Sequence, residues 1–345
     1  MRRRKRWFLA GICCMVLLGG PAEKAGALYL DSDKTMEFSG KAQSRVSIRL
    51  QDSEGFTYPD VSAGNLVQWR NLLLLEFNHD LVQLMDKTQL LYPFKALKTR
   101  VKYHLVGRVL YDGVYDVGPD AFQKVQEQDK DNIDKFKQSY QPWEYYVDVS
   151  RGPLFFRIGR QNLSWGETNI FRLLDNINPL DNTFGGPFED LDDRRIPLQM
   201  VRASYNVGSV GPVSSLNLES FWVPGFWDAH VAPWAPYGTP YAPPQPKLPF
   251  AQQFIYPGKT MDNSRWGFRV TGLLWNNLNF SLVHYKTFLD MPAVRLGVKP
   301  GLEALLNLSH AWQELISEPR TYARNYCDSA AACVASRTSL SLVPG

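Results

Sequence analysis

The chain has 345 residues, of which 13% are aromatic and 21% are charged, and its formal net charge is +4. The first 27 residues hold six basic residues and one acidic residue, a net +5, so the remaining residues together carry −1. The positive charge therefore belongs to the front of the chain. The rest lacks the basic footprint of a nucleic-acid-binding protein, and we expect no nucleic-acid partner.

The front of the chain has the organisation of a secretory signal peptide. A basic run at residues 2–6 precedes an apolar run at residues 7–18, which is too short to cross a bilayer as a helix. The Ala-Gly-Ala of residues 25–27 then supplies a small-residue cleavage pattern. We predict that residues 1–27 are removed and that the mature protein begins at Leu28. A short membrane anchor is the alternative interpretation.

The cysteines divide between the leader and the end of the chain. Cys13 and Cys14 lie inside the apolar run of the leader rather than at its end, which disfavours a lipoprotein. Cys327 and Cys333 form a closely spaced pair in an exported chain, which predicts a loop disulfide. No histidine lies near this pair, so we expect no metal site and no other cofactor.

Beyond the leader, no run of eighteen or more apolar residues occurs, so we expect no transmembrane helix. Two classes then remain for an exported, aromatic-rich chain: a soluble globular protein or an outer-membrane β-barrel. The strands of a barrel carry a weaker hydropathy signal than helices do. The alternation of residues along the chain is the feature that separates the two classes.

The clearest alternation begins at Leu97 and continues with period two for more than a dozen residues, which predicts a strand. Its length exceeds that of a usual globular strand and suits a tilted strand that crosses a bilayer. One face is mostly apolar. The other face carries a basic ladder of Lys98, Arg100, Lys102, His104 and Arg108.

Further alternating stretches complete the predicted sheet. They are residues 38–50, 68–78, 143–149, 154–161, 199–207, 213–223, 265–273 and 278–288, and the final Thr-Ser-Leu-Ser-Leu-Val begins one more. Aromatic residues such as Trp222 and Trp266 lie close to strand ends, as in the interfacial girdle of a membrane barrel. A large soluble β-sandwich or barrel, with these aromatics in its core, is the alternative.

Short and long connections alternate along the chain, which is typical of outer-membrane barrels with short periplasmic turns and long outer loops. The long connections are residues 112–142, 162–197, 224–264 and 290–337. Residues 80–96 break this alternation and predict a small periplasmic helix. The loop at 224–264 is rich in Pro and aromatics, and either binds a sugar or apolar solute or forms a rigid cap. The loop at 290–337 contains helical spacing.

The connection at 162–197 and the strand before it carry a distinctive set of residues. They are Gly159, Arg160 and Gln161, then Trp165, Gly166 and Glu167, then Asp175, Asn178, Pro179 and Asp181, and finally Arg195 and Pro197. This set resembles the signature of a family of Gram-negative outer-membrane proteins known as domain of unknown function 1302. The resemblance runs from about residue 38 to the end. It implies an outer-membrane location and a fold similar to alginate-export-type barrels.

The combined prediction is an all-β fold, an antiparallel transmembrane outer-membrane β-barrel of about nine or ten strands over residues 28–345. Complete barrels of this family end in a strand that closes with an aromatic residue, whereas this chain ends Ser-Leu-Ser-Leu-Val-Pro-Gly. We therefore expect a C-terminally truncated barrel, because an unclosed edge in lipid leaves backbone groups unsatisfied. A small closed barrel is the alternative.

Strand charges must face the lumen, because a charge on the lipid face costs about 2–4 kcal/mol at the bilayer midplane. The lumen therefore carries the basic ladder together with Arg157. We predict that segment 162–197 folds inward as a constriction and that its carboxylates, including Asp192 and Asp193, meet the ladder. An ordinary solvated outer loop is the alternative.

Catalytic motifs for nucleophilic, metal-dependent or phosphate chemistry are absent from the sequence, so we expect no enzyme. The expected function is a channel or exporter for an amphipathic, lipidic or saccharide solute. A non-conducting scaffold or an outer-membrane enzyme is the alternative. The expected partners are outer-membrane lipid and lipopolysaccharide, the barrel-assembly machinery, and export partners in the periplasm or inner membrane.

Overall fold

The structure is a computed structural model, and it describes residues 27–50, 52, 61–88, 92–128, 130–166, 172, 174–184, 191–235, 239–240, 256–275, 277–289 and 334–344. The chain divides into two compact units. Unit 1 comprises residues 1–162, 181–205 and 233–251, and unit 2 comprises residues 163–180, 206–232 and 252–345. Several predictions fall outside the described residues: the leader at 1–26, Glu167, the loop helix within 290–333, and the disulfide between Cys327 and Cys333.

Antiparallel strands dominate the described part of the chain, and they follow one another in the sheet in chain order from β1 to β11. Strand β1, Leu28–Tyr29, has two residues, and the other ten have 8–15 residues each. The predicted all-β antiparallel fold is therefore confirmed. Among the described residues this order has two ends, so the sheet is open. No helix in the described part of the chain is long and apolar enough to span a membrane.

Unit 1 contains β1 and the strands that carry the predicted basic ladder. Its further strands are β2 Met36–Ile48, β3 Leu66–Asp80, β4 Arg100–Asp112, β5 Gln138–Arg151, β6 Leu154–Gln161 and the first part of β7 Leu198–Val210. The bounds of β6 agree with the prediction. Strand β4 begins later than predicted: Lys98 lies in the preceding turn with a φ of 51°. Lys98 is therefore not a strand residue of the ladder, which is a correction.

Unit 2 contains the end of β7 and the remaining strands, β8 Val213–Val223, β9 Arg265–Leu274, β10 Leu278–Phe288 and β11 Val334–Pro344. The bounds of β8 and β10 agree with the predicted ranges. Period-two alternation persists to both ends of β10, whereas β8 has a register shift between Ser214 and Asn217. In register, Trp222 of β8 pairs with Trp266 of β9. Both side chains are exposed, on the face opposite to the buried Phe221.

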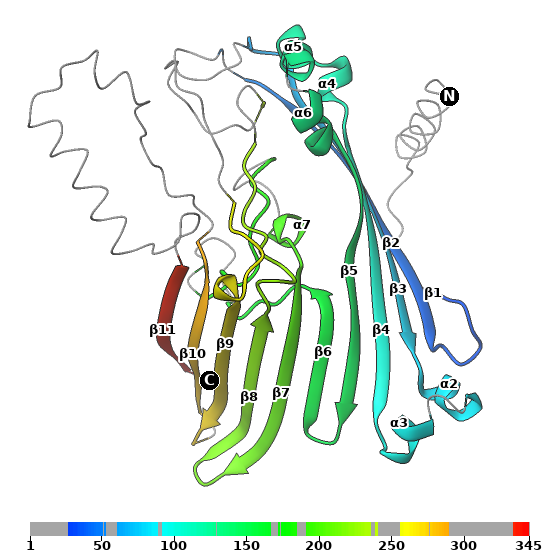
Figure 1. Ribbon diagram of the computed structural model, residues 1–345, viewed down its shortest axis with the longest axis vertical. Helices are drawn as coiled ribbons and strands as arrows, with labels where there is room; N and C mark the ends of the chain where they lie inside the picture. The colour runs from blue at the N-terminus through cyan, green and yellow to red at the C-terminus, as the bar shows by residue number, and fades with distance from the viewer. Residues whose placement is uncertain are drawn as a thin grey trace, which may run out of the picture. The chain divides into compact units, whose positions relative to one another are not determined.

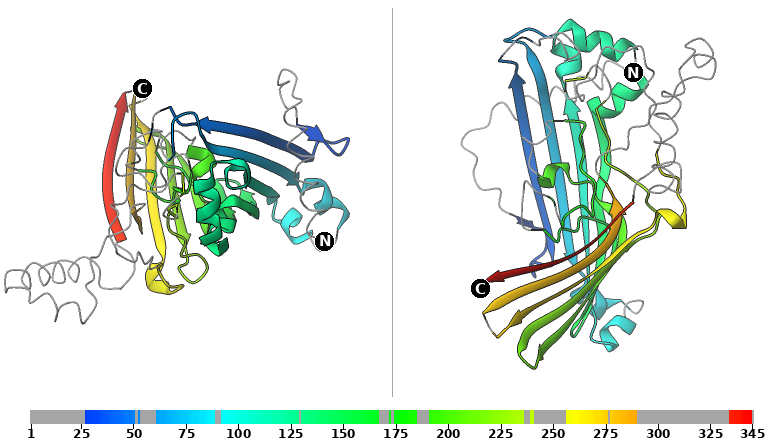
Figure 2. Two further views of the ribbon diagram at one scale, coloured as in Figure 1. Left: turned by 90° about the horizontal axis from the view of Figure 1, so that it is seen from above. Right: turned by 90° about the vertical axis from the view of Figure 1, so that its left-hand side faces the viewer.

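In the described part of unit 1, five short helices lie at the ends of the strands (Figures 1 and 2). The link between β4 and β5 forms α4 Val114–Val117, α5 Asp120–Gln128 and α6 Lys130–Lys137, which enclose a small apolar core. At the opposite strand ends, α2 Val82–Lys87 and α3 Tyr92–Ala96 occupy the link that interrupted the alternation of loop lengths. A helix was predicted for this second link but not for the first.

The unit 1 sheet has an inverted polarity. Large apolar side chains on one face are open to the surroundings, with Leu105 46% and Ile158 48% exposed. The opposite face buries polar and charged side chains, among them Gln68, Arg70 and Arg108, the last only 4% exposed. A water-soluble domain normally places these residue types the other way round. We call the second side the charged face of unit 1.

Candidate functional site

A row of charges of largely alternating sign crosses five strands on the charged face of unit 1. Its members occupy paired positions on neighbouring strands: Asp80, Lys102, Asp148, Arg157 and Arg202. Lys102 Nζ lies 3.3 Å from a carboxylate oxygen of Asp80, and Arg100 Nε donates to the same oxygen at 2.8 Å. Arg157 holds Asp148 with two bonds, at 2.7 and 2.9 Å. The charges of Arg100, Lys102 and Arg157 are thus neutralised largely by carboxylates of neighbouring strands.

Aromatic rings support the cations of this face. The Arg157 guanidinium lies 3.9 Å from the centroid of the Tyr146 ring, and the His104 ring stacks on the same tyrosine at 4.5 Å. Nδ1 of His104 also lies 2.5 Å from the side-chain oxygen of Asn78. Cations over aromatic faces are attracted by the ring quadrupole, more strongly where water is excluded. The Tyr146 ring therefore helps to hold the side chains of Arg157 and His104 in place.

Gly159, the first residue of the signature, permits a local distortion of the sheet. Its φ is +134°, and a Cβ there would lie 2.3 Å from the carbonyl oxygen of Tyr145, so no other residue fits. The pairing of β4 and β5 shifts register nearby, which places Trp143 on the charged face. Arg108 and Arg160 both lie over the Trp143 ring, at 3.9 and 5.6 Å.

Segment 181–195, of which the structure describes residues 181–184 and 191–195, belongs to unit 1, and its described residues contact the charged face. Asp193, at the end of α7 Leu191–Arg194, accepts a hydrogen bond from Lys41 Nζ at 2.9 Å. The Phe184 ring lies 2.8 Å from the guanidinium of Arg70. Arg108 interacts electrostatically with Asp193 and with Asp181. A carboxylate and an aromatic ring of the segment thus meet cations of the strands.

Segment 181–195 also carries its own internal bonds. The Arg194 guanidinium donates to the Asp181 carbonyl at 3.2 Å and to the side-chain oxygen of Asn182 at 2.6 Å. The Asp181 amide donates to the Arg194 carbonyl at 2.7 Å. Asp192 forms an ion pair with Arg195 at 2.7 Å, while its side chain is 91% exposed. The fold of the segment therefore depends on Arg194, and its contact with the strands on Asp193 and Phe184.

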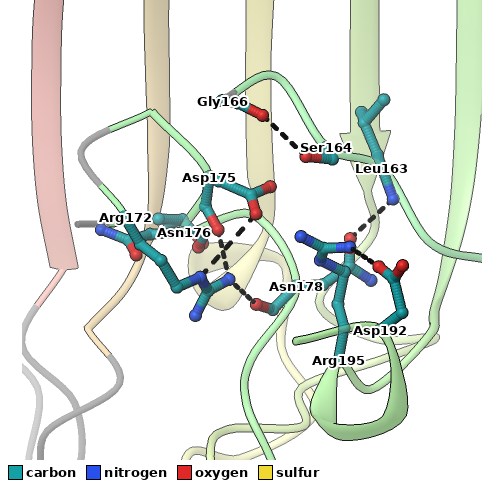
Figure 3. A network of polar contacts seen from close by, with 10 residues as sticks. Leu163, Ser164, Gly166, Arg172, Asp175, Asn176, Asn178, Asp192 and Arg195 are labelled. Carbon is teal, nitrogen blue, oxygen red and sulfur yellow. Dashed lines mark hydrogen bonds and ion pairs between the residues drawn. The ribbon is translucent and has the colours of Figure 1, made fainter. Parts of the chain in front are cut away.

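Segment 163–180 belongs to unit 2 and has a different construction (Figure 3). The Asn178 side-chain oxygen accepts a hydrogen bond from the Leu163 amide at 2.9 Å. Arg172 donates to the carbonyls of Asp175 and Asn178, the latter at 2.8 Å, and its Nε lies 3.8 Å from the Asp175 carboxylate. Gly166 gives room to this network, because a Cβ there would lie 3.0 Å from Cβ of Asp175.

Apolar packing fixes segment 163–180 to the strands of unit 2. The Trp165 ring is 3% exposed, and it lies 5.1 Å from the Phe221 ring and 6.5 Å from the Tyr285 ring. Gly267 leaves space for this cluster, since a Cβ there would lie 2.6 Å from Cβ of Tyr285. Thr287 of β10 adds a hydrogen bond to the Asn176 carbonyl at 3.1 Å.

The structure brings together only part of the predicted constriction. Asp193 and Asp181 are near Arg108, a member of the predicted ladder, but the direct contact of Asp193 is with Lys41. Asp192 differs from the expectation, because its ion pair is with Arg195 on its own segment. Among the remaining signature residues, Gln161 is buried and donates to the Met200 carbonyl, the Pro197 carbonyl accepts from Arg160, and Pro179 is buried.

Four important charged residues were not predicted as members of the site: Lys41, Arg70, Asp80 and Asp148. Asp80 and Asp148 could have been found from the sequence, because extending the alternation of β3 by two residues, and pairing β5 with β4, places them opposite ladder cations. The contact between Lys41 and Asp193 joins residues 152 positions apart, and no periodicity reveals it.

The described residues contain no group of three or more His, Cys, Asp and Glu side chains arranged to hold a metal ion. No curated protein and no solved structure matches the chain. A family model described as "Protein of unknown function (DUF1302)" matches residues 7–336. This match covers almost the whole sequence and confirms the resemblance seen in the signature residues, so the chain belongs to the DUF1302 family.

Proposed function

We propose that the protein is an outer-membrane β-barrel channel or exporter, with the exposed apolar face of its strands in lipid and the charged face of unit 1 turned to a lumen. The inverted polarity of unit 1 carries this proposal. Leu105 and Ile158 are about half exposed, while Arg108 on the other face is almost fully buried. An arrangement that is unfavourable in water is favourable when lipid surrounds the sheet.

Strand length and charge placement support the same proposal. Tilted membrane strands need about 9–11 residues, and the strands β2 to β5 have 13–15. The row from Asp80 to Arg202 lies wholly on the face opposite Leu105 and Ile158. Each Lys or Arg of this row would cost about 2–4 kcal/mol on a lipid face near the bilayer midplane, and each Asp somewhat less. The surrounding partners are then outer-membrane lipid and lipopolysaccharide, after insertion by the barrel-assembly machinery.

Within this proposal, segment 162–197 is the constriction of the lumen. Its second half is held on the charged face by Asp193 and Phe184, which contact Lys41 and Arg70. The solute is amphipathic, lipidic or a saccharide, because cations backed by aromatic rings can bind both anionic groups and apolar or sugar rings. Rings of charge set the ion preference of such a pore.

Conductance of the full chain in planar bilayers tests the proposal. The wild type should conduct ions, and the double variant Arg100→Glu, Lys102→Glu should shift the preference from anions towards cations. Lys34→Glu is the matched control, because Lys34 lies in the turn between β1 and β2. Membrane insertion without conductance, or an ion preference unchanged by the double variant, would refute a conducting lumen lined by the ladder.

A further inference from the structure

Three cations surround an apolar patch on the charged face of unit 1. Lys41 of β2, Leu74 of β3 and Arg108 of β4 occupy one row of paired positions. Neighbouring strands lie about 4.8 Å apart, so the backbones of Lys41 and Arg108 are about 10 Å apart. Arg70 lies four residues from Leu74 on the same strand, and therefore on the same face.

The space between these cations is filled by leucines. Leu72 pairs with Leu110 in the row between Leu74 and Arg70, and both leucines are buried. The surface thus has Lys41 and Arg108 at one end of a leucine patch. At the other end lies a paired row of Arg45, Arg70 and Asp112, which carries one net positive charge. Such a surface is complementary to a molecule that has an anionic head and an apolar body.

Segment 181–195 presents these two kinds of group to the same surface. The Asp193 carboxylate lies against Lys41, with its two oxygens 2.9 and 3.2 Å from Nζ. The Phe184 ring covers Arg70. The Asp193 side chain is 7% exposed, whereas the Lys41 side chain is 51% exposed. Asp193 is therefore the buried partner of this ion pair, and Lys41 is the exposed one.

We propose that Lys41, Arg70, Arg108 and the leucines between them bind an anionic amphipathic solute, one with a carboxylate or phosphate head on an apolar body. Segment 181–195 then occupies this site as an internal stand-in, with Asp193 in place of the head and Phe184 in place of the apolar body. This inference rests on the proposed function, because it names the class of solute that the lumen accepts.

Displacement of the segment by a solute is physically reasonable. The exchange replaces one carboxylate on Lys41 by another, so the ion pair is retained and little electrostatic energy is lost. Asp181 and Asn182 stay bonded to Arg194, and Asn182 stays bonded to the Pro233 carbonyl, so Asp193 and Phe184 can leave the strands while these bonds persist. A solute shifts this equilibrium only to the extent that it binds the uncovered site better than the covered one.

Binding of 4-phenylbutyrate to the full chain in detergent tests the site. Equilibrium dialysis should give tighter binding to Asp193→Asn than to the wild type, by about fivefold, the upper range for a half-exposed ion pair. Lys41→Gln should weaken binding, and Lys41→Arg should restore it, which separates loss of the cation from loss of the fold. Asp192→Asn is the matched control, because it removes the same charge one residue away and should bind like the wild type.

Three related probes test the chemistry of recognition. The neutral 4-phenylbutanamide and the cationic 4-phenylbutylammonium share the apolar body and should bind weakly, and acetate alone should also bind weakly. If inorganic phosphate competes with 4-phenylbutyrate, the site accepts anionic heads in general. If acetate derivatives compete but phosphate does not, the site is specific for a carboxylate head. Equal binding of the amide and the carboxylate would overturn the proposal.

Hydrogen exchange separates this proposal from the proposed function. On addition of 4-phenylbutyrate, amides of residues 191–195 should exchange several-fold faster, while those of residues 174–180 should be unchanged. A protein that shows this response but never conducts retains the site and refutes the channel. A protein that conducts, but binds 4-phenylbutyrate equally as wild type, Asp193→Asn and Lys41→Gln, refutes the site and retains the channel.

Discussion

The two halves of the connection between β6 and β7 are held in different ways. Segment 163–180 is fixed in unit 2 by the buried Trp165 and by hydrogen bonds between Asn178, Arg172 and the backbone. Segment 181–195 contacts the strands of unit 1 through an ion pair at Asp193 and a cation–π contact at Phe184. The first half is thus part of a packed core. The second half is attached to the rest of unit 1 by the Asp193 ion pair, by the buried Phe184 ring on Arg70, and by a backbone hydrogen bond from Asn182 to the Pro233 carbonyl.

This difference indicates which half can move. Burial of Trp165 and satisfied buried amides stabilise the first half by several kcal/mol in total, whereas the ion pair that joins residues 191–195 to the half-exposed Lys41 contributes about 1 kcal/mol or less. Regions that move in a functional cycle come from the least stable parts of a fold. A single connection therefore combines a fixed part with a releasable part, and the two should respond to different perturbations.

The largest effect is expected for Trp165→Ala. Removal of this buried ring from its contacts with Phe221 and Tyr285 leaves a cavity and should lower the local stability of segment 163–180 by about 3–5 kcal/mol. Hydrogen exchange of residues 174–180 in the reconstituted protein measures the loss. Trp222→Ala is the control, because Trp222 is 39% exposed on the opposite face and should leave these amides protected. Equal loss of protection in residues 191–195 would show that the two halves open as one.

A smaller effect is expected for Asn178→Ala. The change leaves the buried Leu163 amide without the side-chain oxygen that now accepts its hydrogen bond, at a cost of about 1–3 kcal/mol. Exchange of the Leu163 amide and of residues 174–180 should accelerate accordingly. Asn182→Ala is the matched variant in the other half, because it removes the acceptor of Arg194. It should accelerate the exchange of residues 191–195 only. Faster exchange of residues 191–195 in Asn178→Ala, or of residues 174–180 in Asn182→Ala, would contradict the distinction between the two halves.

The sequence was sufficient to predict the antiparallel strands of the sheet. The bounds of β6 and β10 follow from alternation, because a strand with one apolar and one polar face must keep period two. Strand ends were less predictable: Asp80 extends β3 into the row of charges, and Lys98 lies outside β4. The helices α4 to α6 were not predicted, since their few apolar residues are widely spaced among charged ones. These residues form a core together with Val61 and with Leu66 and Val67 of β3.

The site was predictable in composition but not in pairing. The signature residues marked the connection, and alternation assigned Arg108 and Arg157 to the charged face. Alternation gives the face of a residue but not the partner that covers it. For this reason the sequence treated Asp192 and Asp193 alike, whereas in the structure only Asp193 lies against a strand cation. Contacts across 152 residues depend on how the whole connection folds.

The pair Asp192 and Asp193 provides a sharp test of the second half. Asp193→Asn should weaken the contact with Lys41 and lower the protection of residues 191–195 by about 1 kcal/mol. Asp192→Asn removes an exposed ion pair with Arg195 and should have almost no effect. Hydrogen exchange of both variants at low salt gives the comparison. Similar losses in the two variants would mean that net charge, rather than the contact with Lys41, holds the segment.

The smallest effect is expected from salt. At 1 M salt the screening length falls to about 3 Å, from about 10 Å at 0.1 M, so attraction between Asp193, Asp181 and the cations Lys41 and Arg108 is reduced but not abolished. Exchange of residues 191–195 should rise by a factor of about two to three, less than for Asp193→Asn. Residues 174–180 should not respond, because apolar burial and buried amide bonds are insensitive to screening.

The variant Asp193→Asn should itself lose most of the salt response. A response that persists in this variant would assign the attachment of the segment to Phe184 on Arg70, and a response shared by residues 174–180 would remove the distinction between the two halves.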